Sequence, residues 1–98
     1  MKSTVIYKIT DDFILKLDIS NLKILKKGYL FAEDLDSPCY DNMKSLIQQR
    51  ISIIEAKQID VWKEIEGILH VQYPNLISYE IQYDENMVPT GELILCLE

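Results

Sequence analysis

The residues from Ser37 to Gln72 constrain the fold most, because this is the only stretch whose apolar residues recur at helical spacing. At about 100° per residue, the apolar side chains of its first half fall within about 160° of arc: Met43, Leu46, Ile47, Ile51, Ile53 and Ile54. Those of its second half fall within about 120°, centred close to the same direction: Val61, Trp62, Ile65, Ile68 and Leu69. One apolar stripe therefore runs through both halves, and the rest of the chain must pack against it.

The ends of this helical stretch carry recognisable signals. Ser37 suits an N-cap and Pro38 the first helical position, whereas Pro74 stops the helix at its other end. A single straight helix here would be about 50 Å long, which exceeds the diameter of a globule of this size. We therefore expect a break near Asp60. The alternative is one unbroken helix, which would imply a dimer.

The flanking segments are predicted to be strands, because their apolar residues alternate or form short β-prone runs. The expected strands cover residues 4–9, 13–19, 22–32, 76–83 and 92–98, the third with a bulge or kink at Gly28. The last strand is apolar on both faces, so we place it in the centre of the sheet. The sequence predicts a single α+β domain over residues 1–98. About five antiparallel strands carry two helices, or one kinked helix, on one face, in the order ββ(β)αα(β)β.

The charge of the chain is unevenly distributed. The net charge is −6; residues 1–63 hold all ten Lys and Arg with nine acids, whereas residues 64–98 hold seven acids and no Lys or Arg. This distribution argues against direct binding of nucleic acid, because phosphate contacts need Lys and Arg. It is compatible with a basic protein partner, whose approach an acidic surface would accelerate.

Carboxylates and tyrosines gather in the C-terminal third and form the predicted partner-binding site: Tyr73, Glu80, Tyr83, Asp84, Glu85 and Glu92. Glu80 and Asp84 are expected on one face of the same strand, and Asp84 also opens the following loop. Such a surface could cover an Arg- and Lys-rich active site, with the charges steering the encounter and the rings supplying contact area. Solvated strand faces also carry acids routinely, and a general acid–base pair is a further alternative.

Arg50 lies near the centre of the apolar arc, where an unpaired buried charge would cost several kcal/mol. It either reaches water along the edge of the stripe or binds a ligand anion in a cleft between sheet and helices.

No metal-ligand pattern is formed by His70, Cys39 and Cys96. We therefore expect no metal, no cofactor and no catalytic residue.

The chain has no signal-peptide pattern and no stretch of about 18 apolar residues, so we expect a cytoplasmic protein without a membrane interaction.

The leading hypothesis for the function is a small acidic, non-enzymatic protein that masks a basic surface. An immunity protein or antitoxin that neutralises a nuclease toxin, or a phage-type inhibitor, would act in this way. One alternative is a small-molecule-binding or enzymatic domain with an anion pocket at Arg50. Another is a structural homodimer built on the isoleucine-rich stripe.

Overall fold

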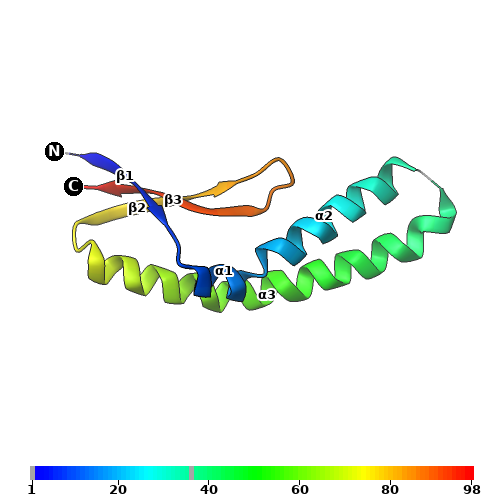
Figure 1. Ribbon diagram of the computed structural model, residues 1–98, viewed down its shortest axis with the longest axis horizontal. Coiled ribbons are helices and arrows are strands. Elements are labelled where there is room, and N and C mark those ends of the chain that lie inside the picture. The colour runs from blue at the N-terminus through cyan, green and yellow to red at the C-terminus, as the bar shows by residue number, and fades with distance from the viewer. Residues whose placement is uncertain (1, 36) are drawn as a thin grey trace.

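The computed structural model of the chain describes residues 2–35 and 37–98. The elements follow in the order β1 (Ser3–Lys8), α1 (Asp11–Leu17), α2 (Ile19–Asp34), the 3₁₀ helix η1 (Pro38–Tyr40), α3 (Asp41–Gln72), β2 (Leu76–Tyr83) and β3 (Pro89–Leu97). The strands form one antiparallel sheet in the order β1–β3–β2 (Figure 1). The predicted α+β class with an antiparallel sheet is therefore confirmed.

The central position of β3 is confirmed as well. Ser3 pairs with Leu97 and Lys8 with Glu92 on one side, while β2 pairs with β3 on the other. Leu93, Leu95 and Leu97 are buried on the inner face of the sheet, as their alternation predicts. The three strands that lie closest to the chain ends were thus located correctly from sequence, except that the last one begins at Pro89 and not at Glu92.

The two strands predicted over residues 13–19 and 22–32 are wrong, because both segments are helical. Phe13, Ile14 and Leu17 turn toward the core at helical spacing, and Leu15, which alternation placed with them, is 75% exposed. Asp18 adopts a left-handed conformation (φ 52°, ψ 40°), which ends α1 and turns the chain into α2. These two segments would have completed a five-stranded sheet. Because they are helical, the described residues form a sheet of three strands.

Gly28 lies inside α2 rather than at a strand bulge. A Cβ at this position would lie 3.8 Å from Cδ1 of Ile47 in α3, so the glycine faces the neighbouring helix. Leu22 and Ala32 of α2 are buried, and Leu25 is half-buried, which is helical spacing. Lys23, Lys26 and Lys27 therefore lie on a helix.

The predicted break near Asp60 is also wrong, since α3 is continuous from Asp41 to Gln72. The length argument failed because the molecule is not a globule; it measures 55 × 22 × 19 Å. The apolar stripe keeps its phase through Asp60 but changes its partner. Ile47, Ile51 and Ile54 pack in a cluster with Leu22 of α2, whereas Ile65 and Leu69 pack beneath the sheet.

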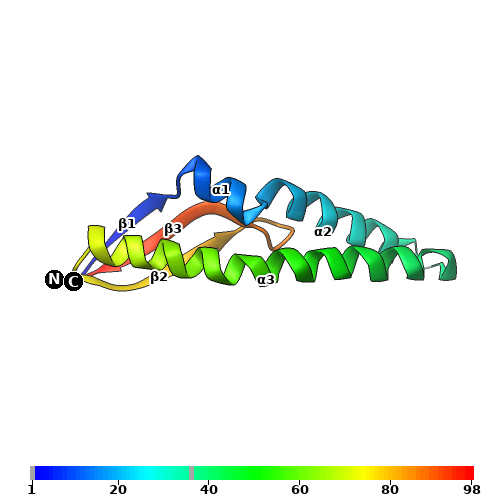
Figure 2. The ribbon, with the colours of Figure 1, turned by 90° about the horizontal axis from the view of Figure 1, so that it is seen from below.

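The molecule accordingly has two ends that share α3, as Figures 1 and 2 show. At one end the sheet packs on the C-terminal half of α3. At the other, α2 and residues 41–58 of α3 project beyond the sheet as a two-helix hairpin, which we call the helical arm. Gln58 is buried at the junction, where its side-chain amide donates a hydrogen bond to the carbonyl of Leu17. That bond satisfies a carbonyl group at the end of α1.

Candidate functional site

The structure divides the predicted acidic and aromatic residues among different surfaces. Tyr73 follows α3 and packs edge-on against Tyr7, with ring centroids 6.2 Å apart. Tyr83 ends β2 beside the buried Pro89, on the side of the sheet that faces the helices. Both tyrosines are thus on the helix-facing side, away from the open side of the sheet. The site predicted from sequence is not one patch.

Glu80 and Glu92 are on the opposite side of the sheet, which we call the open face. Residues that pair directly across antiparallel strands project from the same face. One row of this face therefore holds Ile6, Ile94 and Glu80, and Thr4, Cys96 and Ser78 form a second row. Lys8 and Glu92 pair in a third. The described helices lie on the other side of the sheet (Figure 1), so this face is available to a partner.

The open face combines an apolar centre with exposed carboxylates. Ile6 is 71% exposed, and Ile94 and Cys96 in the central strand are half-buried. Glu80 is exposed on β2 and Glu92 is exposed on β3 beside Lys8. An apolar centre with a polar rim is the usual composition of a protein interface. The site predicted from sequence was restricted to carboxylates and tyrosines, and so it did not include Ile6 and Ile94.

Asp84 serves the turn between β2 and β3 and does not share a face with Glu80. Its Oδ1 accepts hydrogen bonds from the backbone N–H groups of Asn86 and Val88, at 2.9 and 3.1 Å. Its Oδ2 lies 3.6 Å from Nζ of Lys23 in α2. Partial burial acts to raise the pKa of Asp84, but the two N–H groups and the lysine outweigh burial and lower the pKa. The carboxylate therefore closes the turn and ties it to the arm.

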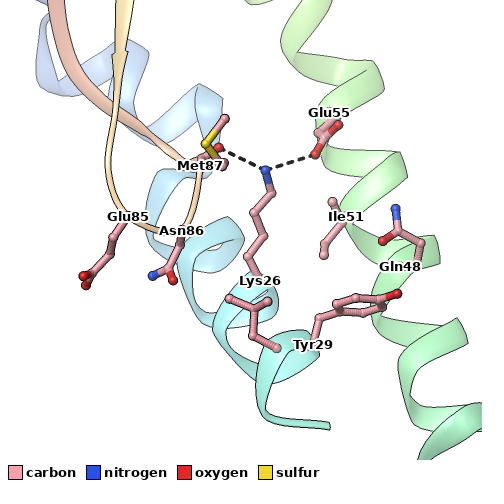
Figure 3. Close-up of a pocket in the computed structure, with 9 residues that line it drawn as sticks. Lys26, Tyr29, Gln48, Ile51, Glu55, Glu85, Asn86 and Met87 are labelled. Carbon is pink, nitrogen blue, oxygen red and sulfur yellow. Dashed lines mark hydrogen bonds and ion pairs between the residues drawn. The ribbon is translucent and has the colours of Figure 1, made fainter. Parts of the chain in front are cut away.

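The turn is also fastened through Lys26, as Figure 3 shows. The Lys26 ammonium donates a hydrogen bond to the carbonyl oxygen of Met87 at 3.1 Å and lies 3.5 Å from Oε1 of Glu55. A cavity of about 380 Å³ opens here between α2, α3 and the turn, and Glu85 points away from the lysine at its margin. The ammonium group of Lys26 in this cavity is therefore already bound by the Glu55 carboxylate and the Met87 carbonyl group.

Arg50 lies elsewhere, in an open groove of about 690 Å³ formed by α2 and α3 alone. The groove is lined by Asn21, Ile24, Leu25, Leu46, Gln49, Arg50, Ile53 and Ile54. Arg50 is exposed, which fits the expectation that it reaches water along the edge of the stripe. The alternative interpretation placed Arg50 in an anion pocket between sheet and helices, whereas the groove that Arg50 lines is formed by helix residues alone.

Two acids of the C-terminal third are paired with lysines from the first third of the chain. Lys16 lies 3.6 Å from Glu64, in addition to the Lys23–Asp84 pair. His70 is exposed and lies 3.7 Å from Glu66. The seven acids of residues 64–98 therefore do not form one continuous acidic surface. The acids left facing solvent without a described ion pair include Glu80 and Glu85.

Within residues 2–35 and 37–98, no helix is long and apolar enough to cross a membrane. In the same residues, no three His, Cys, Asp or Glu side chains are grouped so as to hold a metal ion. The chain matches no protein-family model, no curated protein and no solved structure. The function must therefore be argued from the surfaces themselves.

Proposed function

We propose that the protein is a non-catalytic binding protein that covers a basic surface of a protein partner with the open face of its sheet. The observation that carries this proposal is the row Ile6, Ile94 and Glu80, in which apolar side chains adjoin an exposed carboxylate. Glu92, which pairs with Lys8 across the strands, adds a second exposed carboxylate to this face. Glu85 is exposed at the turn between β2 and β3, beyond the end of the sheet. A nuclease or toxin with an Arg- and Lys-rich active site is the kind of partner that such a surface fits.

The two parts of the surface contribute differently. The carboxylates accelerate encounter with a basic partner, and salt weakens this attraction. The exposed isoleucine supplies contact area that loses its water on binding, at about 25 cal/mol per Å² of apolar surface. Binding through this face should thus respond both to charge removal and to a polar substitution at Ile6.

The experiment is a pull-down from the native cell with the tagged protein, read by mass spectrometry. A stoichiometric basic partner should be captured, and capture should fall steeply as salt is raised. The variant Glu80→Gln/Glu85→Gln/Glu92→Gln removes three exposed charges from this end of the molecule. It leaves Asp84 intact, because neutralising Asp84 would loosen the turn and confuse loss of binding with loss of structure.

A matched control removes three exposed charges elsewhere, with Glu33→Gln, Asp34→Asn and Asp60→Asn. The control should capture the partner as the wild type does, while the first variant and Ile6→Lys should not. Equal capture by all four proteins, or the absence of any partner from the wild-type bait, would contradict the proposal. The small-molecule alternative at Arg50 would then be tested with anionic ligands by thermal shift.

A further inference from the structure

The helical arm carries a second unpartnered apolar surface, which we call the apolar flank. Its ridges are Ile24 of α2 and Leu46 and Ile53 of α3, which are 69%, 61% and 57% exposed. Leu25 and Ile54, both half-buried, line the groove between the helices. Amphipathic helices bury such stripes against another element, and the two helices of the arm cover only part of theirs.

The whole molecule exposes more surface than a compact monomer of its mass. The accessible surface is 6886 Å², whereas a compact monomer of 11.5 kDa would expose about 5,800 Å². The radius of gyration is 16.4 Å, against about 13 Å for a compact domain of this length. The excess of about 1,000 Å² is spread over the elongated molecule, to which the helical arm contributes, and it exceeds the roughly 800 Å² that each partner contributes to a stable interface.

We propose that the occupant of the apolar flank is a second copy of this chain, so that two helical arms pack into a four-helix bundle. A two-fold interface uses the same patch on both subunits, so the patch must contain both a projection and a depression. The flank meets this requirement, because the ridges at Ile24, Leu46 and Ile53 border the groove that the partner's ridges would enter.

The charges of the flank predict how the dimer responds to salt. The residues that line the groove include Arg50 and no acid, so two flanks bring like charges together. Each subunit also carries a net charge of −6. Added salt screens both repulsions, and the dimer should hold or tighten as salt rises. Binding of a basic partner through the open face would respond in the opposite direction.

The test is sedimentation equilibrium of the full chain over a dilution series. The wild type should sediment as a dimer of about twice the 11.5 kDa chain mass. Ile53→Glu places a carboxylate on the flank and should be monomeric, with a dissociation constant at least 100-fold weaker. Ile59→Glu is the matched control. Ile59 is on the same helix and is 59% exposed, but it borders a different cavity, beside Tyr83 and Trp62.

Because Ile53 is exposed in the protomer, Ile53→Glu should fold, and an unchanged far-UV circular dichroism spectrum would check this. A wild type that remains monomeric at the highest concentration overturns the proposal. Equal dissociation of the Ile53→Glu and Ile59→Glu variants, or dissociation of the wild type by added salt, overturns it too. The open face is not part of the flank, so a monomeric wild type that still captures a basic partner would leave the proposed function standing.

Discussion

At the scale of single residues, the stability of the turn between β2 and β3 depends on whether the Asp84 carboxylate is charged. Its pKa is lowered in the folded protein, so the folded state binds this proton less readily than the unfolded chain. The charge therefore adds stability above the ordinary pKa of 3.8, and this contribution is lost as the pH falls through the lowered pKa.

Asp84→Asn tests this coupling, because the amide oxygen can still accept the turn's N–H bonds while the charge opposite Lys23 is lost. We expect the variant to unfold at lower denaturant concentration than the wild type at neutral pH. The difference should shrink as the pH falls through the lowered pKa of Asp84, because the wild-type carboxylate then becomes protonated as well. Glu85→Gln, at the exposed neighbouring residue, is the control and should show little change. If the difference in unfolding midpoint between Asp84→Asn and the wild type stayed constant with pH, the charge could not be its cause.

The same residue marks a limit of prediction from sequence. Alternation located Glu80 and Glu92 correctly on the solvent side, because period-two geometry holds within a strand. Asp84 follows the end of β2, where its direction depends on hydrogen bonds to Asn86 and Val88. Those bonds, and the contact with Lys23 of α2, are set by the turn and by tertiary packing. Neither is encoded in the local pattern.

At the scale of elements, two glycines should respond oppositely to the same substitution. Gly67 is exposed within α3, and a Cβ there would meet no atom within 4 Å. Gly67→Ala should stabilise the protein by about 0.5–1 kcal/mol, because alanine restricts the unfolded chain and favours helix. Gly91 has φ +92° in β3, and its Cβ would lie 3.6 Å from Ile9 and Ile14. Gly91→Ala should destabilise the protein by about 1–3 kcal/mol. Urea denaturation measures both, and a stabilised Gly91→Ala would show that this backbone geometry is wrong.

The elements differ in how far their sequences determine them. β2 and β3 were found because helix spacing does not fit their apolar residues. Residues 13–19 fit both periods, contrary to the expectation that only residues 37–72 have helical spacing, since Phe13 and Leu17 are shared by the alternating and the helical patterns. The choice between them is made by α3, which offers a surface for the helical face of α1. Long-range packing therefore overrides local strand preference here.

At the scale of the whole molecule, stability should be divided between the two ends. Among the described residues, the sheet end holds seven buried core residues: Ile9, Leu17, Ile65, Leu69, Leu93, Leu95 and Leu97. The cluster that joins the arm to the turn holds three: Leu22, Ile51 and Val88. Because α3 belongs to both ends, it connects them, but the arm of an isolated protomer has less buried apolar surface to resist local opening.

Hydrogen exchange followed by mass spectrometry makes this difference measurable. In the monomeric Ile53→Glu variant, amides of α2 and of residues 41–58 should exchange well before those of β3 and residues 61–72. In the wild type, a second arm packed on the apolar flank should slow exchange in the arm and leave the sheet end almost unchanged. Ile59→Glu should match the wild type. Uniform exchange along α3 in the monomeric variant would show that one cooperative core spans the molecule, and the length of α3 would then need no second subunit to explain it.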